Sequence, residues 1–296
     1  MNRDLIGYGG EWPKFTWPNG ARLAVSVVIN FEEGAELQVV DGDKKNEKIG
    51  EVLSVVDDET PDQGQAQIFA YGPRVGVWRI AHELRKYKIT ATIFTCGRAA
   101  KRVSNVLTML ANDGHEIACH GWLWKPNAAY NSKKEELSDL DKATSAIFNV
   151  TNKLPLGFFC RGSESPWTRE LLAKRGYFYS SNAFDDDLPY TDPTGLIIVP
   201  YALDTNDMKF FHPNGFVSSN DMVDYVVDAL DVLENETQLG QTRLLNIGFH
   251  LRIIGRPGRF KAFEQILQKL QSKKEKIWIA RRIDIAKAFV AATCQK

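Results

Sequence analysis

The sequence predicts an α/β barrel, and two observations indicate it. Eight short apolar segments recur along the 296 residues, and most are apolar on both faces, as in LAVSVVINF and LLNIGFHL. Continuous apolar strands are typical of a parallel sheet that helices cover on both sides. Helical patterns fill most of the intervals between the segments. So many alternating strand and helix units favour a barrel over an open sheet.

The expected strands and helices follow one another along the whole chain. Pro73 is suited to the first turn of one helix, Ser219-Asn220-Asp221 offers an N-cap to a second, and Pro257 can open a third. The apolar stripe of the first helix would be Val77, Trp78, Ala81 and Leu84. The strands are expected within residues 22–31, 88–95, 115–121, 154–162, 177–182, 196–203, 243–252 and 276–282.

Two long polar stretches interrupt this alternation. Residues 34–67 follow the first strand directly, and residues 182–193 contain Asp185-Asp186-Asp187. Long irregular loops in a compact α/β fold are usually functional lids or interface segments. For the aspartate run, solvation, helix capping or a salt bridge is the simplest interpretation. No linker or repeat divides the chain, so we expect a single domain over residues 1–296.

Composition excludes several classes of protein. The 37 Lys and Arg balance 37 Asp and Glu, which disfavours a nucleic-acid binder or a binder of anionic membranes. No apolar stretch resembles a signal peptide or a membrane span, so we expect a cytoplasmic protein. The cysteines lie far apart without CxxC spacing, and we expect structural thiols, with a metal or nucleophile role as the alternative. They are Cys96, Cys119, Cys160 and Cys294.

Chemically competent side chains follow four of the expected strands. In barrels of βα units the reacting groups lie at the carboxyl ends of the strands. One carboxylate could act as general base on water, a His as acid for the leaving group, and an Arg as orienter of substrate or stabiliser of an anion. The residues that satisfy this rule are Glu32 and Glu33 after the first strand, His120 after the third, Arg161 after the fourth and His250 after the seventh.

Each of these residues alone has a plainer interpretation. A Glu pair after a strand is commonly a solvated loop, and a His after an apolar run is commonly a hydrogen-bonded core residue. Their shared position at strand ends is what favours a hydrolytic site. His82 in a helix and His212 in a loop lack that support, and His115 begins its strand and is interpreted as structural.

Several motifs resemble those of the polysaccharide deacetylase superfamily, the NodB-homology or carbohydrate esterase family 4 domain. NFEEG resembles its TFDDG motif, GHEIACHGW its second motif, and CRG and IGFHLR its third and last motifs. The resemblance implies a single-domain, distorted (β/α)7 TIM-like barrel. It is closest to the cofactor-independent allantoinases of purine catabolism. The segments that resemble this branch are NFEEGAE, YGPRVGVWR, GHEIACHGW, DDLPY, PYALDTNDM and HLRIIGRPGR.

The resemblance implies roles for the site residues and also a departure. Glu32 takes the position of the family's general base, Glu33 and His120 those of two metal ligands, and the family's second His falls on Trp124. A Glu is longer than the family's Asp by about 1.5 Å. Zinc sites use three protein ligands and a water. We therefore expect no cofactor; the alternative is zinc or another divalent ion held by Glu33, His120 and a third ligand such as His250.

The expected activity is hydrolysis of a ring amide in a small ureide such as allantoin. Glu32 or Glu33 would deprotonate water, and His120 or His250 would protonate the leaving nitrogen. Arg161, Arg256, Trp122 and Trp124 are the expected substrate-binding residues, with Trp124 stacking on a flat ring. The alternatives are an N-deacetylase of polysaccharide or peptidoglycan with a degraded metal site, and a catalytically silent barrel. The resemblance also implies a homo-oligomer, favouring a tetramer, with the loop after the first strand at a neighbour's site or interface.

Overall fold

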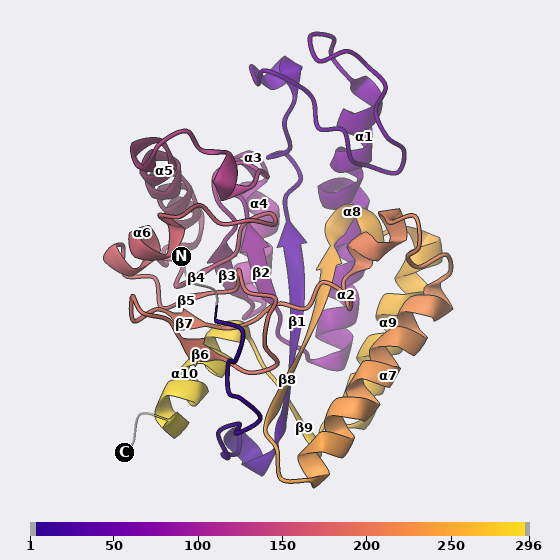
Figure 1. The fold of residues 1–296 in the computed structure, drawn as a ribbon. Coiled ribbons are helices and arrows are strands. Elements are labelled where there is room, and N and C mark those ends of the chain that lie inside the picture. The colour runs from indigo at the N-terminus through magenta and orange to yellow at the C-terminus, as the bar shows by residue number, and fades with distance from the viewer. Residues whose placement is uncertain (1–3, 294–296) are drawn as a thin grey trace.

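The computed structural model describes residues 4–293 as one curled sheet surrounded by helices (Figure 1). Neighbouring strands in the main sheet are parallel, except that β6 and β7 are antiparallel. The α/β barrel class predicted from the apolar segments is confirmed. The order of strands across the sheet is β6 (Tyr190–Thr191), β7 (Ile197–Ile198), β5 (Tyr179–Ser180), β4 (Gly157–Phe158), β3 (Glu116–Cys119), β2 (Thr92–Thr95), β1 (Leu23–Phe31) and β8 (Arg243–His250).

Strand β1 pairs with three other strands, β2, β8 and β9 (Ile277–Ile279). Its residues are all buried, as its unbroken apolar run predicts. Strand β8 pairs with β1 along its length. Strand β9 pairs with the first residues of β1, and β2 pairs with its last residues. The register places Asn30 of β1 beside His250 of β8. The carboxyl ends of these strands therefore meet on one side of the molecule, below the long loop that follows β1 (Figure 1).

Among residues 4–293, no regular pairing joins β8 to the β6–β7 end of the sheet, so the curled sheet closes there through irregular backbone. Here an isolated parallel bridge joins Asn206 to Gly248, and the amide of Gly248 donates to the carbonyl of Thr205 at 3.1 Å. Residues 199–206, which we call the seam segment, thus take the place of a regular strand. Strands β4, β5 and β7 fall within expected segments but span only two residues each, and the polar stretch at residues 182–193 contains β6, an unexpected strand.

Helices cover the sheet on both flanks. Helices α7 and α9 lie side by side on one flank, with α3, α4 and α5 on the other (Figure 1). The helices are α1 (Gln63–Tyr71), α2 (Val77–Tyr87), α3 (Gly97–Arg102), α4 (Ser104–Asn112), α5 (Lys133–Thr151), α6 (Thr168–Lys174), α7 (Ser219–Gln238), α8 (Leu251–Ile254), α9 (Pro257–Ser272) and α10 (Arg282–Thr293). Across residues 4–293, none of them combines the length and the apolar character that a membrane span requires.

The helix expected to begin near Pro73 differs from the prediction. Pro73 lies in a π-helical segment, Gly72–Gly76, that joins α1 to α2, and the helical path already begins after the cap Asp62. Trp78 is 46% exposed and does not belong to the core. The buried face of α2 runs through Val77, Ile80, Ala81 and Leu84, and Trp78 lies about 100° around the helix from Val77.

Two further expectations concern a cap and the cysteines. The N-cap of α7 is Ser218 and not Ser219, and its side chain forms a capping box with Asp221. Cys96, Cys119 and Cys160 are free and buried, and burial raises the pKa of each thiol, as for structural cysteines. Cys294 lies outside the described residues.

Candidate active site

Three of the residues predicted at strand ends converge on one carboxylate oxygen. Glu32 follows β1, His120 follows β3, and His250 ends β8. The Oε1 atom of Glu32 lies 3.2 Å from Nε2 of His120 and 3.2 Å from Nε2 of His250. All three side chains are almost fully buried, and they line a cavity of about 560 Å³. This juxtaposition is what the strand-end rule predicts for parallel strands.

Each imidazole is held from behind by an acceptor for its Nδ1 proton. In His120 that acceptor is the carbonyl oxygen of Phe159, so Nε2 is the ring atom that faces Oε1 of Glu32. In His250 it is the carboxylate of Asp207, with Nδ1 and Oδ1 2.6 Å apart. The other oxygen of Asp207 accepts from the amides of His250 and Ile254.

Asp207 is a functional candidate that sequence reasoning does not find. It lies in a short 3-10 helix, Asp207–Phe211, beyond the seam segment, where no apolar run marks a strand end. It is nevertheless completely buried against β8. The sequence signal for it is the segment PYALDTNDM, which resembles the allantoinase branch.

Neighbouring charges shift the pKa values of Glu32 and His250 in opposite directions. Burial alone would raise the pKa of Glu32, but the positive charges of His250 and Arg252 outweigh it and hold that pKa well below its usual range. Burial lowers the pKa of His250, yet Glu32 and Asp207 more than reverse this and raise it to about 9. At neutral pH the pair is therefore a carboxylate and an imidazolium, which can donate one proton toward each carboxylate.

The buried guanidinium of Arg252 pairs with both adjacent glutamates. Its Nη1 atom lies 2.8 Å from Oε2 of Glu32 and 3.4 Å from Oε1 of Glu33. Its Cζ atom is 4.2 Å from the centroid of the Phe69 ring and 4.8 Å from that of Trp124. A fixed cation between aromatic rings thus stands directly behind the carboxylate that faces the cavity.

Glu33 points away from the cavity and does not line it. Its oxygens accept from the backbone amides of Arg252 at 2.9 Å and of Glu32 at 3.1 Å. Gly72 makes room for it, because a Cβ there would lie 2.7 Å from Cδ of Glu33. Burial raises the pKa of Glu33 to about 7, with repulsion from Glu32 a smaller contribution. The doubled Glu of the motif therefore consists of one residue in the cavity and one behind it.

Among the expected substrate-binding residues, Arg161 and Trp124 line the cavity. The Cζ atom of Arg161 lies 3.6 Å from the centroid of the Trp124 ring, and its Nη1 atom lies 2.6 Å from Oε2 of Glu47. Glu47 belongs to the long loop after β1, and Ile49 of the same loop lines the cavity. One face of Trp124 is thus already covered by a guanidinium.

Trp122 and Arg256 are placed elsewhere. The Nζ atom of Lys142 lies 3.9 Å from the centroid of the Trp122 ring, which packs between helices and is not part of the cavity lining. Arg256 stacks on Tyr71, pairs with Glu51 at 3.6 Å and lines a separate surface hollow. Both lie close to the site in sequence, but α8 and the turn after β3 direct them away from it.

The donor set does not fit the zinc site of the family. Within residues 4–293, no group of three or more His, Cys, Asp or Glu side chains is arranged to hold a metal ion. Glu33, the expected ligand, is turned toward the backbone amides of Glu32 and Arg252 and away from the imidazoles. The position of the family's second His is Trp124, which has no lone pair for coordination.

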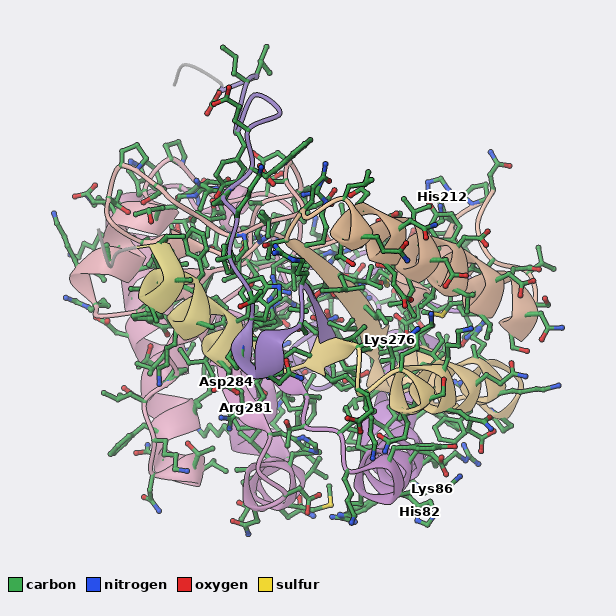
Figure 2. The ribbon with its side chains drawn as sticks, turned by 90° about the horizontal axis from the view of Figure 1, so that it is seen from below. His82, Lys86, His212, Lys276, Arg281 and Asp284 are labelled. Carbon is green, nitrogen blue, oxygen red and sulfur yellow. The ribbon has the colours of Figure 1, made fainter. Side chains whose placement is uncertain are left out.

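Another part of the cavity wall is neutral and polar. Asn30, Tyr201 and Asn206 line it, and Tyr201 stacks on Phe159 with centroids 4.3 Å apart and planes inclined by 8°. Phe159 in turn stacks on His120 at 5.2 Å. His212 lines the cavity although it follows no expected strand, whereas His82 and Lys86 project from the outer side of α2 (Figure 2).

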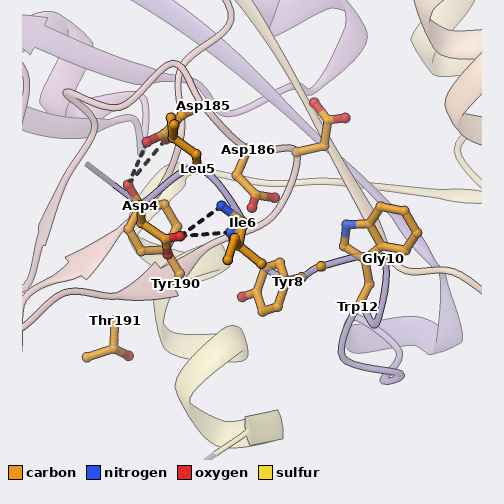
Figure 3. Close-up of a pocket in the computed structure, with 13 residues that line it drawn as sticks. Asp4, Leu5, Ile6, Tyr8, Gly10, Trp12, Asp185, Asp186, Tyr190 and Thr191 are labelled. Atoms are coloured by element: carbon orange, nitrogen blue, oxygen red, sulfur yellow. Dashed lines mark hydrogen bonds between the residues drawn. The ribbon is translucent and has the colours of Figure 1, made fainter. Parts of the chain in front are cut away.

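A second cavity, of about 630 Å³, lies between the N-terminal segment and the aspartate run (Figure 3). The carboxylates of Asp185 and Asp186 accept hydrogen bonds from residues of their own loop. Asp186 accepts from the amide of Leu188 at 3.0 Å, and Asp185 accepts from the hydroxyl of Tyr190 at 3.2 Å. The aspartate run therefore acts as a turn stabiliser, close to the plainest interpretation of its sequence.

Comparisons with known proteins identify the family. The polysaccharide deacetylase family model matches residues 57–179. A Schizosaccharomyces pombe protein, which bears the name polysaccharide deacetylase as an unproven assignment, is 31% identical over 318 aligned positions, covering 98% of this chain and 97% of its own. A probable polysaccharide deacetylase from Pseudomonas aeruginosa has a structure that matches with a TM-score of 0.94 and 36% identity, covering 100% of both chains.

A second solved structure, PuuE allantoinase, matches equally well. Its TM-score is also 0.94, with 35% identity over 100% of this chain and 99% of its own. Two near-equal structural matches thus carry different names, so overall similarity does not choose between a deacetylase and an allantoinase. What the comparisons do share is a family. The chain belongs to the polysaccharide deacetylase family, whose members hydrolyse C–N amide bonds.

Proposed function

We propose that this protein hydrolyses a ring amide of a small ureide, with allantoin as the first substrate to test. The observation that carries the proposal is the size and lining of the cavity above Glu32. Its volume of about 560 Å³ is that of a small-molecule site. The long loop after β1 contributes Ile49 to the wall, and the segment after the seam contributes Met208 and Phe211. The lining combines apolar side chains with the guanidinium of Arg161, which suits a small ring that carries a ureido group.

The proposed reaction begins with a water molecule beside the Glu32 carboxylate. The water donates a hydrogen bond to Oε1 of Glu32, which His120 and His250 flank at 3.2 Å each, and one of its lone pairs faces the amide carbonyl carbon. As the C–O bond forms, Glu32 takes a proton from the water. As the C–N bond breaks, the imidazolium of His250 protonates the leaving nitrogen.

The site then returns to its starting state without any other reactant. The proton held by Glu32 passes to Nε2 of the now neutral His250, 3.2 Å away. The net reaction adds one water across the C–N bond. The depressed pKa of Glu32 keeps it ionised before the reaction, and its basicity rises when His250 loses its charge. Asp207 keeps the imidazole of His250 in the required orientation.

Arg161 is the proposed contact for the polar part of the substrate. Glu47 and the Trp124 ring fix its guanidinium, so its remaining N–H groups can donate forked hydrogen bonds to a ureido or anionic group. Trp124 acts through Arg161 in this arrangement, as a platform for the guanidinium as well as an apolar wall.

We also propose that the reaction needs no metal, because Arg252 places a permanent positive charge on Oε2 of Glu32. Activity should survive dialysis against a chelator, and added zinc should not raise it. Stoichiometric zinc in the purified protein, together with loss of activity on chelation, would contradict this and favour a deacetylase.

The alternative function is N-deacetylation of a sugar polymer, which the names of two relatives favour. The deciding experiment measures ureide hydrolysis of allantoin and acetate release from chitooligosaccharides with the same purified protein. The proposal predicts the first activity and not the second. A Glu32→Gln variant in both assays shows whether any activity arises from this site. A wild-type protein with neither activity, or an activity that the variant keeps in full, would favour the catalytically silent barrel.

A further inference from the structure

The hydroxyl of Tyr201 has an unusual set of hydrogen-bond partners for a group in a cavity wall. The side-chain amide of Asn30 donates to it at 3.1 Å, and that of Asn206 donates at 2.8 Å. Asn30 lies on β1, whereas Tyr201 and Asn206 belong to the seam segment. Two parts of the barrel that are far apart in sequence therefore aim donors at the same oxygen.

The orientation of both amides is fixed by the backbone. Nδ2 of Asn30 also donates to the carbonyl of Phe249 at 3.2 Å, which a flipped amide could not do. Oδ1 of Asn206 accepts from the amide of Met208 at 2.8 Å, so its nitrogen must face Tyr201. Neither assignment is a free choice between oxygen and nitrogen.

The hydroxyl proton of Tyr201 is left available for a further hydrogen bond. A phenol oxygen has two lone pairs and one proton, and both lone pairs are occupied by the two amides. Among residues 4–293, the hydrogen bonds of the Tyr201 hydroxyl include no acceptor for its proton. Burial raises the pKa of this hydroxyl, so the proton is retained at any working pH.

The surrounding residues place this donor beside the reacting groups. Asn30 pairs in register with His250, and the Tyr201 ring stacks on Phe159, which stacks on His120. Gly248 is required for the arrangement, because a Cβ there would collide with the hydroxyl of Tyr201 and the amide of Asn206. The hydroxyl is thus fixed by Asn30, Asn206 and the space at Gly248 before any substrate enters.

We propose that Tyr201 donates its hydrogen bond to the carbonyl oxygen of the scissile ring amide and stabilises the oxyanion that forms when water adds. Asn30 and Asn206 are positioning residues for it. This inference rests on the proposed function and deepens it. The site accepts a substrate whose scissile carbonyl reaches the seam wall while its carbonyl carbon lies over Glu32, as in a five-membered cyclic amide or imide.

The test is Tyr201→Phe in the full-length protein, assayed with allantoin and with hydantoin. The variant keeps the stacked ring and loses the donor, so kcat should fall by about 10²-fold or more, as for other oxyanion donors, while KM changes less than about threefold. Asn206→Asp is the second variant. It replaces a donor by an acceptor that captures the Tyr201 proton, and kcat should fall to a similar degree with the ring intact.

Tyr177→Phe is the matched control. Tyr177 is another buried tyrosine, whose hydroxyl bonds Thr144 at 2.7 Å and does not line the cavity. Its loss should lower the melting temperature without changing kcat. If the wild type is active and either folded variant, Tyr201→Phe or Asn206→Asp, keeps kcat within about threefold, the role of Tyr201 is overturned while the proposed function stands. If the wild type hydrolyses no cyclic amide, both proposals fail together.

Discussion

The two walls of the cavity are built in different ways. One wall, the strand-end wall, consists of Glu32, His120 and His250 at the ends of regularly paired strands. The other, the seam wall, carries Tyr201 and Asn206 on irregular backbone that a single bridge joins to β8. Every group expected to exchange a proton with substrate lies on the strand-end wall. The seam wall supplies neutral donors, so proton transfer and hydrogen bonding to the substrate carbonyl are divided between the two parts of the barrel.

The largest expected effect tests the strand-end wall. Glu32→Gln keeps the shape of the side chain but removes the proton acceptor, and kcat should fall by about 10²–10⁴-fold, the usual scale for a lost general base. Steady-state kinetics with allantoin measure it, and circular dichroism checks that the fold is retained. Turnover within tenfold of the wild type would remove Glu32 from the mechanism.

A somewhat smaller effect is expected at Asp207, which connects the two walls. Asp207→Asn removes a negative charge that raises the pKa of His250. The pKa should fall from about 9, so the basic limb of the pH–rate profile moves to lower pH, and kcat at pH 8 falls by about 10²-fold. Asp185→Asn, in the aspartate run, is the control and should leave the profile unchanged. An unmoved basic limb would show that His250 is not the acid.

The strand-end wall could be predicted from sequence and the seam wall could not. A buried parallel strand is recognised in the sequence by an unbroken apolar run. The polar residue at the end of the run marks the carboxyl end of the strand, where catalytic groups lie in such barrels. Glu32, His120 and His250 follow that rule. Tyr201 lies inside the apolar segment 196–203 and Asp207 lies beyond it, so neither marks the end of a strand in the sequence, and β7 itself is only two residues long. Their burial depends on how the sheet closes on itself, which local sequence does not encode.

The directions of side chains also could not be predicted from the sequence. Glu33 was expected in the site with Glu32, but the side chain of a residue after a strand can turn to either side. Glu33 turns away from the cavity because backbone amides donate to it and Gly72 leaves room for it. Trp78 was expected on a buried stripe, yet the buried face of α2 is set by its approach to the sheet and leaves Trp78 at the border.

Glu33 should therefore affect stability more than turnover. Burial raises its pKa from 4.5 to about 7, so between these values the folded protein holds a proton that the unfolded chain has lost. The free energy of unfolding should fall as pH rises through this window, by at most about 1.4 kcal/mol per pH unit. Glu33→Gln should remove that part of the slope and lower kcat less than Glu32→Gln does. Urea denaturation at pH 5 and pH 7.5 measures it; an unchanged slope would contradict the raised pKa.

The smallest effect on kinetics is expected at Arg161 and Arg256. Both were expected from the sequence to bind substrate, but only Arg161 lines the cavity. Its loss in Arg161→Ala should raise KM about tenfold or more, the scale of one charged hydrogen bond. Arg256 stacks on Tyr71 outside the cavity, so Arg256→Ala should leave both kcat and KM within about twofold. The two variants remove the same group, so the comparison isolates position from charge. A large rise in KM for Arg256→Ala would mean that the substrate extends beyond the two walls, toward the hollow that Glu51 and Arg259 share with Arg256.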